Sequence, residues 1–96
     1  MPVFAVTYVY GPDTETRLAH RPAHRQWQAA QNASGAMLAS GPFTDDEQPG
    51  GLLLVSAADQ DAAREMLTGD PYHDLGVIAE TRIREWNPMF GAFAED

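Results

Sequence analysis

The chain has 96 residues and a formal net charge of −8, and its six basic residues other than histidine are all arginines. With 44% apolar and 21% charged residues, it has the composition of a soluble globular protein, so we expect one domain over residues 1–96. The acidic balance argues against nucleic acids and anionic membranes as partners. The lack of cysteine excludes disulfides, thiolate metal sites and a cysteine nucleophile.

The first predicted element is a strand at residues 3–10, VFAVTYVY, which is apolar on both faces and ends at a Gly-Pro-Asp turn. This N-terminal segment lacks the basic region and cleavage site of a secretory signal. No apolar run approaches the length of a membrane span. We therefore expect a cytoplasmic protein.

A helix is predicted next, because Pro22 is a favourable first helical residue with Arg21 at the cap position, and Gly35 is a typical C-terminal stop. A short strand at residues 36–43 follows. It leads into an acidic, turn-rich loop at residues 44–51.

The second half of the chain is predicted to contain a strand, a helix, a short helical turn and a last strand. A continuous apolar run predicts a buried strand at 52–56, and a helix with an acidic first turn follows at 59–67. Asp70 and Pro71 are typical of the cap and first residue of another short helical turn. A last strand is expected at 77–86.

The predicted order, β-α-β-β-α-β, is the ferredoxin-like α+β arrangement, with four antiparallel strands and both helices on one face of the sheet. The other face would then be bare, although the first and third strands are apolar on both sides. So small a chain cannot expose that much apolar surface to water. We therefore expect a homodimer, packed sheet against sheet as a dimeric α+β barrel.

His24 is a candidate general base, because a neutral imidazole near the start of a helix can accept a proton. It would need a carboxylate to fix its tautomer. Asp70 is the best candidate, since the two helices of this fold lie side by side. Both residues also have plain structural interpretations, His24 as a solvated helix residue and Asp70 as a helix cap before Pro71.

Four further residues are candidates for binding a small-molecule substrate. Arg21 can hold a carboxylate through two hydrogen bonds, and Ser40 can donate to a substrate or hold the site's acid. Phe43 and Tyr72 can form apolar walls. The ordinary alternatives are a solvated arginine, a serine that satisfies a turn, and aromatic residues of the core.

Metal and cofactor sites are not expected. His20 and His24 have the spacing of a metal pair, but Pro22 biases His20 out of the helix. A Ser-His-Asp hydrolase would lack the G-x-S-x-G turn, and no phosphate-binding or dinucleotide-binding glycine motif is present.

Taken together, RPAH at 21–24, SGPF at 40–43 and DPY at 70–72 resemble the YCII (YciI-like) family, as does Trp86 near the end of the last strand. Each motif is short, but their order and spacing span almost the whole chain. The resemblance implies a ferredoxin-like fold that dimerises through its sheets and a cleft with a histidine-aspartate pair proposed as catalytic.

By matching motif, that pair falls on His24 and Asp70, with Ser40 nearby and Arg21 as the arginine that often precedes the histidine. Related members include a dehydrochlorinase acting on a chlorinated hydroxyhydroquinone. Most members have no known substrate, so the resemblance does not supply a reaction. The resemblance implies no role for His73 and Asp74, which follow the DPY motif.

The sequence is compatible with three functions. The first is a cofactor-independent enzyme in which His24 and Asp70 carry out an elimination or isomerisation, dehydrochlorinase-like or lyase-like, on a small cyclic or phenolic substrate. The second is a non-catalytic small-molecule-binding or regulatory module. The third is a structural subunit in which the motifs are only helix caps.

Overall fold

The computed structural model describes residues 1–94 and has four strands and four helices. In chain order the elements are β1 (Val3–Tyr10), α1 (Thr14–Ala19), α2 (Arg21–Ser34), β2 (Met37–Pro42), β3 (Gly50–Ser56), α3 (Gln60–Leu67), α4 (Pro71–Leu75) and β4 (Ile78–Trp86). The sheet order is β2-β3-β1-β4 and all neighbouring strands are antiparallel. The expected ferredoxin-like α+β fold is confirmed. Among the described residues, no helix has the length and apolarity needed to cross a membrane.

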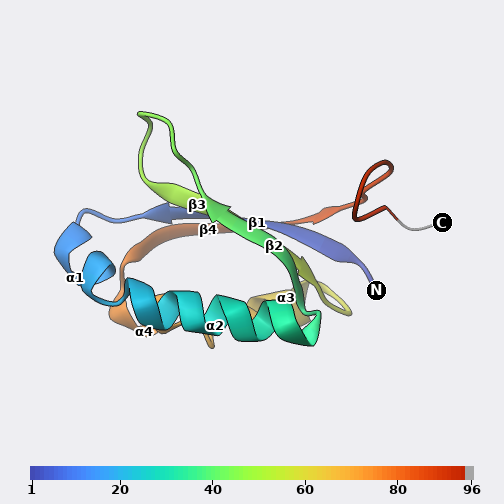
Figure 1. Ribbon diagram of the computed structural model, residues 1–96, viewed down its shortest axis with the longest axis horizontal. Helices are drawn as coiled ribbons and strands as arrows, with labels where there is room; N and C mark the ends of the chain where they lie inside the picture. The colour runs from blue at the N-terminus through green and yellow to red at the C-terminus, as the bar shows by residue number, and fades with distance from the viewer. Residues whose placement is uncertain (95–96) are drawn as a thin grey trace.

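Helices cover one face of the sheet. Figure 1 shows α2, α3 and α4 along that face, with α1 at one end and the β2–β3 connection projecting away from the helices. Along β1 the side chains of Phe4, Val6, Tyr8 and Tyr10 point toward the helices and are buried. This alternation follows from the two-residue period of a strand, and it places Tyr8 and Tyr10 beneath the helix starts.

The opposite face of the sheet carries the other half of the β1 and β3 side chains. The strand register pairs Thr7 with Leu52 and Val3 with Trp86, so these four residues share that face. Leu52 and Trp86 are 38% and 42% exposed. Apart from Thr7, the side chains of β1 and β3 on this face are apolar up to Leu54, namely Val3, Ala5, Val9, Leu52 and Leu54, so both strands are largely apolar on both faces, as predicted.

Helix α1 is the element that the sequence pattern does not predict, because six residues are too few to show a helical period. Its cap is recognisable in retrospect: Asp13 accepts hydrogen bonds from the Thr16 N–H at 3.1 Å and from Thr16 Oγ1 at 2.8 Å. The helix buries Arg17, which is 9% exposed. Arg17, for which the sequence pattern makes no prediction, is thereby placed at the edge of the core.

The predicted start of α2 is wrong by one residue. Arg21 is the first helical residue, and His20 occupies the cap position without a side-chain hydrogen bond to the helix. The His20 imidazole instead lies 3.0 Å from the Thr16 carbonyl oxygen. The predicted stop is correct, since Gly35 adopts a left-handed conformation with φ of 86°.

Candidate functional site

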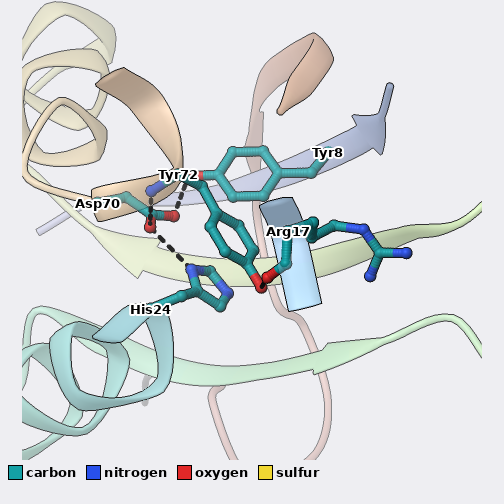
Figure 2. A network of polar contacts seen from close by, with 5 residues as sticks. All are labelled: Tyr8, Arg17, His24, Asp70 and Tyr72. Carbon is teal, nitrogen blue, oxygen red and sulfur yellow. Dashed lines mark hydrogen bonds and ion pairs between the residues drawn. The ribbon is translucent and has the colours of Figure 1, made fainter. Parts of the chain in front are cut away.

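His24 and Asp70 form a buried contact between α2 and α4 (Figure 2). The His24 Nδ1 atom lies 2.8 Å from the Asp70 Oδ1 atom, and the two residues are 6% and 1% exposed. His24 belongs to the first turn of α2, and Asp70 is the cap of α4. The two residues, 46 positions apart in the chain, therefore come together as the sequence predicts.

Asp70 is the centre of a fully buried hydrogen-bond network. Its Oδ1 atom accepts the Tyr72 backbone N–H at 3.0 Å in addition to the contact with His24, and its Oδ2 atom accepts the Tyr8 hydroxyl at 3.1 Å. The bond to the Tyr72 N–H is the helix cap of α4. The Asp70 carboxylate therefore caps α4 and also contacts His24, so the two interpretations of Asp70 do not exclude one another.

This arrangement fixes the chemistry available at His24. An ionised carboxylate only accepts hydrogen bonds, so the contact places a proton on Nδ1 and leaves Nε2 as the free nitrogen of the neutral ring. That is the tautomer in which a histidine can take a proton from a substrate and then be stabilised as a cation by its carboxylate partner.

Aromatic rings hold the imidazole in place. The Tyr72 ring stacks on His24 with a centroid distance of 4.0 Å and an interplanar angle of 4°, and the half-buried Trp27 lies farther off at 6.3 Å. The Tyr72 hydroxyl donates to the Arg17 carbonyl oxygen at 3.1 Å. The His24 ring therefore has little freedom to rotate away from Asp70.

The tyrosines around the pair stay protonated over a wide pH range. Burial raises the pKa of Tyr8 far above its ordinary value, and the Asp70 carboxylate adds to the rise. Burial also raises the pKa of Tyr10 to about 12, with the nearby Tyr72 and Asp70 adding to it and two arginines opposing it. The Tyr8 hydroxyl is therefore a permanent donor to Asp70 at physiological pH.

A cavity of about 320 Å³ lies beside the pair, lined by the last turn of α1, the first two turns of α2, the start of α4 and strand residues. His24 lines it, as do Arg21, Ser40 and Tyr72, three of the four residues predicted to bind substrate. The fourth, Phe43, lies apart. It lines a different depression of about 300 Å³ with Leu52 and Leu54 of β3.

The cavity also contains residues that the sequence did not single out, namely Arg17, Arg25, Gln28 and Tyr10. Gln28 lies one helical turn after His24, so the helical period was a usable signal for it. Arg17 had no such signal, because it depends on the unpredicted α1. Tyr8 and Tyr10 read as ordinary core residues of an apolar strand.

The other two histidines lie outside this network. His20 is exposed, and His73 forms an exposed contact of 3.2 Å between its Nδ1 atom and Asp74 Oδ1. Within residues 1–94, no group of three or more histidine and acidic side chains is placed to hold a metal ion.

Comparison with known proteins agrees with the fold described above. Among solved structures, the fold is similar to that of 5-chloro-2-hydroxyhydroquinone dehydrochlorinase from Burkholderia phenoliruptrix, determined as a complex with 2,5-dihydroxybenzoquinone. The TM-score is 0.75 at 22% sequence identity, covering 88% of this chain and 93% of that one. A search of curated protein sequences finds no match.

The family model of the YCII-related domain matches residues 2–87. With nearly the whole chain matched, the protein belongs to the family of YCII-related domains.

Proposed function

We propose that this protein is a small cytoplasmic enzyme that needs no cofactor and uses His24 and Asp70 for general acid–base chemistry on a single-ring substrate. The observation that carries the proposal is the 2.8 Å contact between the two buried side chains beside a cavity that His24 itself lines. A general base of this kind contributes about 10²- to 10⁴-fold in rate.

The proposed reaction is an elimination or isomerisation that begins with proton removal. The Nε2 atom of His24 takes a proton from a hydroxyl or carbon of the ring, and the bonding electrons form a new double bond. In an elimination, a leaving group departs with its own electron pair; in an isomerisation, the proton returns at another position. Asp70 stabilises the imidazolium until His24 gives up its proton.

The size of the cavity supports a single-ring substrate. Binding sites for small molecules usually span about 300–1,000 Å³, and this cavity, at about 320 Å³, is at the small end. The structurally similar dehydrochlorinase is named for a chlorinated hydroxyhydroquinone and was solved with a single-ring quinone. That likeness supports testing hydroxylated, halogenated rings first.

The test is release of chloride from 5-chloro-2-hydroxyhydroquinone under anaerobic conditions, corrected for the reaction without protein. We expect turnover by the natural protein and a loss of about 10²-fold or more in His24→Asn. His20→Asn is the matched control, because this exposed histidine lies four residues away and outside the cavity. Equal rates for His24→Asn and the natural protein would contradict the proposed role.

A second candidate function is ligand binding without turnover. It is favoured by the 6% exposure of His24, which leaves little of the ring open to a substrate. In that case a ligand would bind in the cavity and protect the protein against unfolding. No substrate of the proposed class would then be converted faster than in buffer alone.

We also propose that two copies pack through the uncovered face of the sheet. Leu52 and Trp86 are exposed there, and Phe43, which adjoins that face beside Leu52, is 46% exposed. Apolar side chains gathered on one face favour burial against a partner. The partner we propose is a second copy of this chain.

A further inference from the structure

Three arginines surround the cavity beside His24. Arg17 comes from α1, and Arg21 and Arg25 come from the first turns of α2. They are half of the six arginines in a chain whose net charge is −8. Positive charge is therefore concentrated in one cavity of an otherwise acidic protein.

None of these arginines forms an ion pair with a carboxylate of residues 1–94. Among residues 1–94, no arginine lies within 4.0 Å of a carboxylate oxygen, and both ion pairs of that region involve histidine. Three cations around one cavity, with no carboxylate partner among the described residues, create a positive field that favours an anionic ligand.

Arg17 gives the clearest indication. It is more than nine-tenths buried, and its Nε atom has no hydrogen-bond partner among the described residues. Its guanidinium carbon lies 4.7 Å from the centroid of the Tyr10 ring, a contact that offsets part of the cost of burying a cation. A buried charge without an anionic partner is otherwise unfavourable. An anion in the cavity would complete this site.

We propose that the cavity binds a single-ring compound carrying a planar oxyanion, either a carboxylate or an ionised enol or phenol. The proposal rests on the proposed function and specifies its substrate class. Arg17 and Arg21 hold the oxyanion. Tyr10 and Tyr72 also line the cavity, although one face of each ring is already covered, by Arg17 and by His24. The planar fork of arginine matches a carboxylate through two parallel hydrogen bonds, and its N–H groups can also donate to the single charged oxygen of an ionised enol or phenol.

The geometry separates the two ends of the ligand. Figure 2 shows the Arg17 guanidinium pointing away from the His24 imidazole, beyond the Tyr72 hydroxyl. The charged end of the substrate therefore lies toward Arg17, and the proton to be removed lies toward His24. Arg25, which follows His24 in the helix and lines the same cavity, is placed to stabilise negative charge that develops on the ring.

The test compares two probes of equal shape, 4-hydroxybenzoate and the neutral 4-hydroxybenzamide, by isothermal titration calorimetry. We expect the carboxylate to bind about tenfold or more tightly than the amide, with an advantage that shrinks as ionic strength rises. The pair 2,5-dihydroxybenzoquinone and 2,5-dimethoxybenzoquinone repeats the comparison for an ionised enol and shows which oxyanion is preferred. Equal affinity for the charged and neutral members of both pairs would overturn the proposal.

Variants assign the effect to the cavity. Arg17→Gln and Arg21→Gln should each remove most of the preference for the anion, whereas Arg64→Gln removes the same charge from the exposed surface of α3 and should leave it intact. Arg21 is only half-buried, so its variant remains informative if Arg17→Gln does not fold. Loss of preference in Arg64→Gln to the same extent would contradict the assignment.

His24→Asn distinguishes this inference from the proposed function. If the variant loses turnover but still prefers the anionic probe, both proposals hold. If it keeps full turnover and the preference, the acid–base role of His24 fails while the anion site stands. If the natural protein shows no preference but His24→Asn loses turnover, the anion site fails and the catalytic pair stands.

Discussion

Asp70 is the residue on which the site depends, because three donors converge on one carboxylate that is 1% exposed. A solvent-exposed helix cap contributes only its single bond to the helix. Removing Asp70 would also leave the Tyr8 hydroxyl and the His24 ring nitrogen buried without acceptors. Removing the buried Asp70 should therefore lower the free energy of unfolding more than removing an exposed helix cap.

We predict that Asp70→Ala lowers the free energy of unfolding by about 3 kcal/mol, since the lost cap and the two unsatisfied donors each cost about 1 kcal/mol or more. Asp59→Ala is the matched control, because Asp59 caps α3 from an exposed position with one bond of 2.8 Å to the Ala62 N–H. That variant should lose only about 1 kcal/mol. Urea denaturation measures both, and equal losses would mean that Asp70 is a cap and nothing more.

Tyr8 donates a hydrogen bond to the second oxygen of Asp70, and we propose that it acts as a positioning residue. Tyr8→Phe removes a 3.1 Å hydrogen bond without changing the ring, so we expect a loss of about 1 kcal/mol in stability and a lower kcat with little change in KM. The measurement is steady-state kinetics together with urea denaturation. Tyr10→Phe serves as the stability control, because the Tyr10 hydroxyl donates no hydrogen bond within residues 1–94. Equal losses of stability would argue against this role for Tyr8.

The buried tyrosines also predict how stability depends on pH. The pKa of Tyr10 rises from 10.0 to about 12 on folding, so above pH 10 the unfolded chain releases protons that the folded chain retains. Stability is therefore fully present below pH 10 and falls as the pH rises from about 10 to about 12. Denaturation at a series of alkaline pH values measures this decline, which should become shallower in Tyr10→Phe. A flat profile would mean that Tyr10 is accessible to solvent.

At the scale of elements, the strands were predictable where their composition is strongly apolar, as in the leucine-rich β3 and in β1, which is also rich in β-branched residues. Predicted and observed boundaries differ by no more than two residues at either end of each strand and of α3. Helix α1 was not predicted, because its six residues show no helical period. The position of Arg17, which lies in α1, was therefore not predicted either. The contacts of Tyr8 and Tyr10 were not predicted for a different reason. An aromatic residue in an apolar strand is usually a core residue, and the sequence does not show which group lies next to its hydroxyl.

Strand β3 begins with two glycines, and Gly50 is required by its neighbours. A Cβ atom at this position would overlap the Tyr8 carbonyl oxygen of β1, whereas a Cβ atom at Gly41 in β2 would meet nothing within 4 Å. We predict that Gly50→Ala costs about 2 kcal/mol or more, because the two strands must separate. Gly41→Ala should change stability by less than about 0.5 kcal/mol. Thermal denaturation followed by circular dichroism measures both, and equal melting temperatures would contradict this packing.

At the scale of the whole molecule, helices cover one face of the sheet, and the proposed dimer covers the other. Leu52 lies at the centre of the uncovered face opposite Thr7 of β1 and is 38% exposed. We predict that Leu52→Asp shifts the protein from dimer to monomer, because a carboxylate cannot be buried there without a partner. Sedimentation velocity measures the mass, with the exposed Leu75→Asp of α4 as the control. A natural protein that sediments as a monomer would contradict the proposed dimer.

The central claim is that His24 and Asp70 act as one catalytic unit, and a double-mutant cycle on kcat tests it most directly. Residues that act as a unit give strongly non-additive losses. We predict that His24→Asn combined with Asp70→Asn has a kcat within about threefold of His24→Asn alone, because Asp70 acts only through the imidazole. Losses that multiply in the double variant would show that the two residues act independently and would contradict the claim.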